Sequence, residues 1–126
     1  MNRRASILTL AAGAAASAAP PAPVNPIQLH VDLEVGDEKL LLANFSKIFK
    51  PAISRQDGFV EVRLLKFRKA MLGNGPGSWN YRLLISFKTE EQRMKWVASD
   101  DHQKAWPTIE KCLKGAKVAA WLYDIS

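Results

Sequence analysis

Two indoles and a histidine stand close together in the last third of the chain. Trp96, His102 and Trp106 are spaced so that one short helical region would carry all three. Imidazole titrates near neutral pH and can act as a general base, and indole rings can form flat apolar walls. An alternating strand at 79–88 runs straight into this region. The combination predicts a pocket for a flat apolar ligand, with His102 as the group that removes a proton.

Removal of a proton from such a ligand also needs polar donors that stabilise the anion and walls that exclude water. His30 is the second candidate base, because it projects from the first strand opposite that strand's apolar residues. Asn44 is a candidate donor, together with Tyr81 or Arg82, which alternation places on opposite faces of a strand. The predicted site therefore comprises catalytic His102, His30 and Asn44 and substrate-binding Trp96, Trp106, Phe45, Tyr81 and Phe87.

Each of these residues also has a structural interpretation. His102 follows Ser99 by three residues and fits an ordinary histidine at a helix end. His30 shares its face with Gln28, Asp32 and Glu34, which fits solvent or a dimer interface. The indoles fit core or lid positions, and Phe45 fits the apolar stripe of a helix. The residue types alone leave these alternatives open.

Other classes of site are excluded by spacing. No group of His, Cys, Asp and Glu has metal-ligand spacing, so no metal is expected. Asp100 and Asp101 fit the start of a helix, and the glycine-rich run 73–77 joins two strands instead of opening a helix. Cys112 is the only cysteine, which excludes an internal disulfide. The sequence therefore predicts a site without cofactors.

The length of 126 residues predicts one domain with a core of its own. The formal net charge is +6, and two of the six charges belong to Arg3 and Arg4 near the N-terminus. The remaining Lys and Arg residues are spread along the chain with acids between them. A nucleic-acid binder would carry a denser basic stripe, so nucleic acid is not an expected partner.

The N-terminus resembles an export signal. Residues 1–4 are short and positive, 5–15 are small and apolar, and Ala16-Ser17-Ala18 fits a signal-peptidase site. The arginine pair suggests the twin-arginine route, although Ser6 stands where that signal usually has a hydrophobic residue. We expect a signal peptide at 1–18, an Ala/Pro linker at 19–26, and an exported, periplasmic or extracellular domain at 27–126. The alternative is a cytoplasmic protein with a disordered tail. Stable membrane insertion is not expected, because the apolar run is short.

The mature chain reads as strand, helix, two strands, helix and strand. Alternation predicts the first strand, and a stripe at helical spacing with Asp37 as cap predicts the first helix, with its last turn kinked or restarted near Pro51. The second helix opens with a capping box at 89–92, restarts at Ser99 and takes Pro107 as the first residue of a further turn. Gly115 is expected to end it. The predicted strands are 27–35, 59–69, 79–88 and 117–125, with a loop at 70–78.

This order predicts an α+β, ferredoxin-like βαββαβ fold, with a four-stranded antiparallel sheet and helices on one face. The other face of the sheet has no cover in a monomer, yet its strands carry apolar residues on both sides. Such a face is an association surface. A two-fold homodimer with the sheets face to face would bury it.

Over residues of about 26–125, the chain resembles the antibiotic biosynthesis monooxygenase family of dimeric α+β barrel proteins. The resemblance is carried by the order and spacing of four segments: Val35-Gly36, Gln56-Asp57-Gly58-Phe59, Phe87-Lys88-Thr89-Glu90-Glu91, and Trp96-x-x-Ser99-x-x-His102-Gln103. The chain departs from the family at Phe87, where the family typically has tryptophan, and near 85–86, where it typically has Glu.

The resemblance implies a homodimer with one pocket per subunit, and oxidation of phenols, anthrones or quinols by molecular oxygen without metal or flavin. Heme-degrading relatives share the Trp-x-x-Ser helix, but Trp106 stands where their ligating histidine would be, and indole cannot ligate iron. We therefore expect a cofactor-independent monooxygenase. The alternatives are a non-catalytic dimeric module that binds a small aromatic or apolar ligand, and a heme binder with altered ligation.

Overall fold

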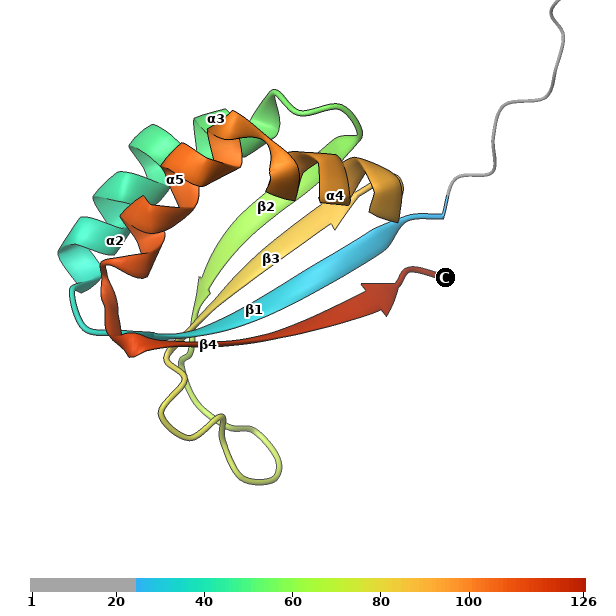
Figure 1. Cartoon of the computed structure of the whole chain (residues 1–126). Helices are drawn as coiled ribbons and strands as arrows, with labels where there is room; N and C mark the ends of the chain where they lie inside the picture. Colours follow the sequence, from blue (N-terminus) through green and yellow to red (C-terminus); the bar gives the residue numbers. More distant parts are fainter. Residues whose placement is uncertain (1–24) are drawn as a thin grey trace, which may run out of the picture.

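The computed structural model describes residues 25–126 of the chain. The expected signal peptide, and the expected linker as far as residue 24, lie outside the described residues. Within residues 25–126, the helices and strands follow the expected order (Figure 1). In chain order the elements are β1 (Ile27–Val35), α2 (Glu38–Asn44), the π-helical turn η1 (Phe45–Phe49), α3 (Lys50–Ser54), β2 (Phe59–Lys66), β3 (Tyr81–Phe87), α4 (Glu90–Ala98), α5 (Asp100–Glu110) and β4 (Leu113–Asp124).

The four strands form one curled antiparallel sheet in the order β2-β3-β1-β4, and all the helices lie on one face of it (Figure 1). The central strand β1 pairs with β3 on one side and β4 on the other, so that Val31 lies opposite Leu83 and Ala120. The ferredoxin-like fold expected from the sequence is confirmed. β2 and β4 are the edge strands, and the helices cover the β4 edge least.

Alternation decides which residues enter the core. The odd-numbered residues of β1 face the helices and pack with the helix stripe, while the even-numbered ones face away. Leu33, Leu41 and Ile53 have no exposed surface, and Cys112 is buried at the end of the same cluster, as its position on an apolar stripe predicts. The helix-side face of the sheet is therefore the core of the domain.

The helix ends follow the predicted caps. The Asp37 side chain accepts from the Leu40 backbone N–H at 3.0 Å, and Thr89 Oγ1 accepts from the Gln92 N–H at 3.1 Å. Ser99 caps α5 by accepting from the His102 N–H, so the expected break between α4 and α5 is confirmed. These caps fix the direction from which α5 approaches the sheet.

The predicted restart of the first helix near Pro51 is confirmed, because α3 begins at Lys50 after the π turn η1 and has Pro51 in its first turn. Two other local predictions are wrong. Pro107 lies inside α5 and does not begin a new turn. Gly115 does not end the second helix; it lies within β4 at φ +62°, which glycine adopts without strain.

The β2–β3 connection is longer than expected. β2 ends at Lys66, β3 begins at Tyr81, and the loop between them projects to the side of the sheet that carries no helices (Figure 1). The Asn80 side chain holds its base, accepting from the Val35 N–H at 2.7 Å and donating to the Val35 carbonyl at 3.0 Å. The residues 67–75 of this loop are all exposed.

Candidate active site

A pocket opens between the sheet and the α4–α5 region, on the helix-side face. Its volume is about 190 Å³, and its lining is apolar except for two side chains, His102 and Arg93. The sheet supplies the floor and the helices supply the wall and roof. The lining residues are Leu29, Val31, Phe49, Leu83, Ile85, Arg93, Trp96, Val97, His102, Trp106, Val118 and Ala120.

The break at Ser99 brings the aromatic residues of two helices together. Trp96 ends its helix facing the core and is almost fully buried, while His102 and Trp106 lie one turn apart on α5. The His102 ring meets Trp96 edge-on at 5.0 Å and lies nearly parallel to Trp106 at 6.4 Å between centroids. The structure therefore places the three residues predicted from their spacing in one pocket wall.

The imidazole of His102 is the one group in this wall that can take up a proton near neutral pH. Burial lowers the pKa of His102 below its usual value, because desolvation disfavours the charged ring. Within residues 25–126, its backbone N–H is bonded to Ser99, but no hydrogen bond reaches either ring nitrogen. The ring is therefore neutral at pH 7 and has a nitrogen lone pair available to a ligand.

Arg93 provides the only permanent charge in the lining. Its guanidinium makes a bidentate pair with Glu90, at 2.6 and 2.7 Å, and its side chain is 18 % exposed. The pair holds the arginine in place at the pocket boundary. Sequence reasoning missed this residue. The available signal was its position three residues before Trp96, which puts both on one helix face.

His30 lies on the opposite face of the sheet and cannot reach this pocket. Arg82 Nη1 donates to His30 Nδ1 at 3.3 Å, His30 Nε2 donates to the Gln28 side-chain oxygen at 2.8 Å, and Gln28 donates to Ser86 Oγ at 3.1 Å. A guanidinium only donates hydrogen bonds, so Nδ1 must accept from Arg82. The proton of neutral His30 is therefore on Nε2. Burial and the Arg82 charge lower the pKa of His30, and Asp32 opposes them.

The remaining predicted site residues lie elsewhere in the core. The Asn44 side chain donates to the Thr108 carbonyl at 2.8 Å, and Phe45 stacks on Phe49. The Tyr81 hydroxyl donates to Glu38, which together with burial raises the Tyr81 pKa to about 12. Phe87 is fully buried against Phe59. None of these four residues lines the pocket, so a direct role in it is not supported by their positions.

The pocket is open on the side of β4. Val118 and Leu122 lie on the helix-side face of that strand, and both are nearly half exposed. Val97 of α4 lines the pocket with Val118, and Met94, three residues earlier on the same helix, is also exposed. We call these four residues, Met94, Val97, Val118 and Leu122, the apolar rim. An uncovered rim of this kind favours an apolar contact.

The described residues favour organic ligands over metals. No group of three or more His, Cys, Asp and Glu side chains within residues 25–126 could hold a metal ion. The volume of the pocket, about 190 Å³, is below the roughly 300 Å³ of sites that enclose drug-sized ligands. Among residues 25–126 no helix is long and apolar enough to cross a bilayer.

Several solved structures have the same fold. SnoaB, a cofactor-independent oxygenase from Streptomyces nogalater, matches with a TM-score of 0.63 at 15% identity, over 81% of this chain and 94% of that protein. A proposed antibiotic biosynthesis monooxygenase from Bordetella bronchiseptica matches with a TM-score of 0.63 at 16% identity, over 81% and 98%. A dimeric ferredoxin-like protein of unknown function from Jannaschia sp. matches with a TM-score of 0.67 at 14% identity, over 79% and 99%.

No family model and no curated protein sequence matches the chain. The structural matches confirm, at the level of the fold, the resemblance to antibiotic biosynthesis monooxygenases that the sequence indicates. At such identities the likeness extends to the arrangement of helices and strands, and function must be argued from the site.

Proposed function

We propose that the protein is a homodimeric, cofactor-independent monooxygenase that oxidises a small phenolic or quinol-type aromatic with molecular oxygen. The observation that carries the proposal is His102, a neutral imidazole with no hydrogen bond to its ring nitrogens among residues 25–126, in an apolar pocket between two indoles. A base in such surroundings removes a phenolic proton and leaves the anion shielded from water.

The volume of the pocket limits the substrate. A dry apolar cavity of about 150 Å³ holds benzene, so 190 Å³ suits one aromatic ring or two fused rings. A larger polycyclic substrate, such as an anthrone, would extend past the apolar rim between α4 and β4. We therefore expect hydroquinones and naphthols to be turned over before anthrones.

The residues divide the reaction as follows. His102 takes the hydroxyl proton, and the phenolate becomes electron-rich enough to reduce oxygen. Trp96 and Trp106 hold the ring flat, and the charge on Arg93 stabilises the anion from the pocket boundary. One oxygen atom enters the ring and the other leaves as water, so a phenol and O₂ give a quinone and H₂O. The substrate supplies all the electrons, and no reductant is needed.

The homodimer is supported by the face of the sheet without helices, which we call the open face. Leu65, Trp121 and Tyr123 are exposed on it, around the hydrogen-bonded row that contains His30. Aromatic side chains around satisfied polar groups are typical of the centre of a protein interface. Several proteins with this fold are described as dimeric. We expect a dimer in sedimentation, and Trp121→Glu should give monomers.

A non-catalytic binding module remains the second candidate. The binding module is favoured by the small number of polar groups in the pocket. Of the lining residues, only His102 and Arg93 have side chains that carry or take up a charge. Both candidates predict that an aromatic ligand binds. They differ in whether oxygen is consumed.

Oxygen uptake and ligand binding should therefore be measured on the same samples. Purified protein is titrated with 1-naphthol and with hydroquinone, and quenching of tryptophan fluorescence reports binding because two of the four tryptophans line the pocket. An oxygen electrode then reports turnover, with heat-denatured protein as the control for spontaneous oxidation. We expect saturable uptake, one O₂ per quinone formed.

Binding without uptake above the denatured control would reject the oxygenase and leave the binding module. Absence of binding as well would reject both. Lys104→Ala, an exposed residue on α5 that does not line the pocket, is the matched control for later variants on that helix.

A further inference from the structure

The loop between β2 and β3, residues 67–80, projects from the open face and has exposed apolar residues at its tip. We call it the arm. Met71 is 77 % exposed and Leu72 is 93 % exposed, and Phe67, the first residue of the arm, is exposed as well. Exposing large apolar side chains to water on a projecting loop is unfavourable, so their exposure points to a contact with another molecule.

The arm is also basic. Residues 67–80 contain two cations, Arg68 and Lys69, and no Asp or Glu. Both come just before the apolar tip, and neither makes an ion pair within residues 25–126. Whatever binds the arm must therefore offer an apolar patch with acidic groups beside it.

The chain itself carries such a patch. Val97 and Val118 of the apolar rim line the pocket, and a hollow lined by Glu90, Glu91 and Asp124 lies at the start of α4 and the end of β4, the two elements that carry the rim. Glu91 and Asp124 are exposed and make no ion pair among the described residues, whereas Glu90 is paired with Arg93. The rim and this hollow match the arm in both polarity and charge.

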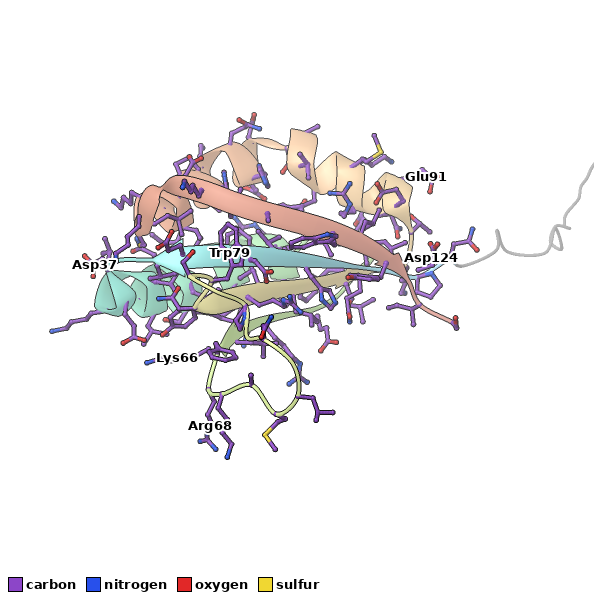
Figure 2. All side chains as sticks on the ribbon, turned by 90° about the horizontal axis from the view of Figure 1, so that it is seen from below. Asp37, Lys66, Arg68, Trp79, Glu91 and Asp124 are labelled. Carbon is purple, nitrogen blue, oxygen red and sulfur yellow. The ribbon has the colours of Figure 1, made fainter. Side chains whose placement is uncertain are left out.

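Within one molecule the arm projects from the open face (Figure 1), whereas the apolar rim lies on the helix side of the sheet. Lys66, where the arm leaves β2, lies in register with Tyr81 and Leu33, while Asp124 lies opposite Ile27 at the other end of β1. Six residues of strand separate them, about 20 Å. Figure 2 shows Lys66 at the end of β2, Arg68 on the loop, and Glu91 and Asp124 toward the opposite end of the sheet.

We infer that the arm of one subunit docks on the apolar rim of the partner, with Arg68 and Lys69 beside Glu91 and Asp124 of the second copy. This inference rests on the proposed face-to-face homodimer. Packed sheets lie roughly 10 Å apart, and an arm of this length can extend about 23 Å from its base. It can therefore pass the edge of the partner sheet and reach the helix side.

A two-fold axis makes the contact reciprocal, so two arms close two pockets. In each pocket, Met71 and Leu72 of the other copy cover the mouth and exclude water from the ring of a bound ligand. The pocket is then completed by the second copy, and dimerisation and ligand affinity are coupled.

Charge reversal tests this inference without disturbing the fold, since all four residues are exposed. One variant is Arg68→Glu with Lys69→Glu, and the other is Glu91→Lys with Asp124→Lys. In each homodimer, like charges then face each other at both contacts, and we expect the dissociation constant to rise about tenfold or more. In a mixture of the two, both contacts regain opposite charges.

The expected result is a heterodimer of near wild-type affinity from the mixture, detected by sedimentation with one variant carrying a fluorescent label. The quadruple variant should likewise recover the homodimer. If both charge-reversal variants dimerise with the dissociation constant of the wild type, and the mixture shows no preference for the heterodimer, the arm contact is overturned. The proposed dimer would remain. A monomeric wild type would instead reject the dimer and the arm contact together.

Binding of the wild-type dimer to phosphatidylserine vesicles, lost in the Arg68→Glu, Lys69→Glu variant while the dimer is unaffected, would also overturn the inference. It would assign the arm to an anionic membrane surface.

Discussion

One histidine lies on each side of the sheet, and the two differ in their hydrogen bonds. His30 on the open face has both ring nitrogens engaged, one by Arg82 and one by Gln28. His102 on the helix side has neither engaged within residues 25–126 and borders an apolar pocket. Both have a lowered pKa, so titration alone does not distinguish them. The hydrogen bonds do distinguish them. An imidazole with both nitrogens hydrogen-bonded stabilises the fold, and one with neither nitrogen bonded is available to a ligand.

The largest expected difference between the faces is in catalysis. His102→Ala should lower kcat/KM about 10²- to 10⁴-fold, because it removes the base. His30→Ala should lower it less than about tenfold, through the dimer. Both are measured by oxygen uptake at a protein concentration that keeps the dimer intact, beside Lys104→Ala. The larger loss in His30→Ala would reverse our assignment of the two faces.

The second difference lies in stability, and adjacent residues of β3 report it. Leu83 is fully buried on the helix side, and Leu84 is half-buried on the open face. Leu83→Ala should lower the free energy of unfolding by about 3 kcal/mol at every protein concentration. Leu84→Ala should cost about 1 kcal/mol in urea unfolding, and its cost should vary with concentration because it weakens the dimer. Equal, concentration-independent losses would contradict this division.

A smaller effect concerns the ion pair on the open face. Asp32 is only 6 % exposed and accepts from Arg82 at 2.7 and 3.2 Å. Arg82→Leu leaves this carboxylate buried and unpaired, and since the Arg82 side chain is 42 % exposed we expect a loss of about 2 kcal/mol. The Asp32→Leu, Arg82→Leu double variant should recover most of that loss in urea unfolding. A double variant as unstable as Arg82→Leu would show that the pair itself stabilises the fold.

The smallest expected effect is the dependence on pH. Burial lowers the pKa of His102, so below a pH of about 6.5 the unfolded chain takes up a proton before the folded chain does. Stability therefore declines as pH falls from 6.5 through the folded pKa, and kcat/KM falls with it because the neutral ring is the base. His102→Gln should show a weaker decline in urea unfolding between pH 7 and 5. An unchanged decline would assign the titration to His30 or to the carboxylates.

Strand boundaries were predictable where the pattern and the pairing agree. The alternation at 27–35 gives β1 its observed bounds, because both neighbours pair with it from Ile27 to Leu33 and β4 pairs with it again at Val35. The pattern at 59–69 continues past the end of β2 at Lys66, since alternation does not show where a partner strand is lacking. Gly115 indicated a helix end, although its positive φ serves a strand.

The candidate site was predictable only in part. The spacing of Trp96, His102 and Trp106 identified one wall of the pocket, because residues on adjoining helical turns share a face whatever the tertiary structure. Phe87 lies on the same sheet face as Leu83 and Ile85, yet Phe59 fills the space over it. Periodicity thus identifies the face and not the position of the hollow along it.

The sequence alone determined the order of elements, the two faces of each strand and the caps that start the helices, because these depend on local backbone geometry and on neighbours within a few residues. The tertiary structure decided which stretch of the core stays unfilled, which histidine ring has no hydrogen bond from residues 25–126, and on which side the arm projects. Those features depend on how helices and strands distant in the sequence meet, and no local pattern records that.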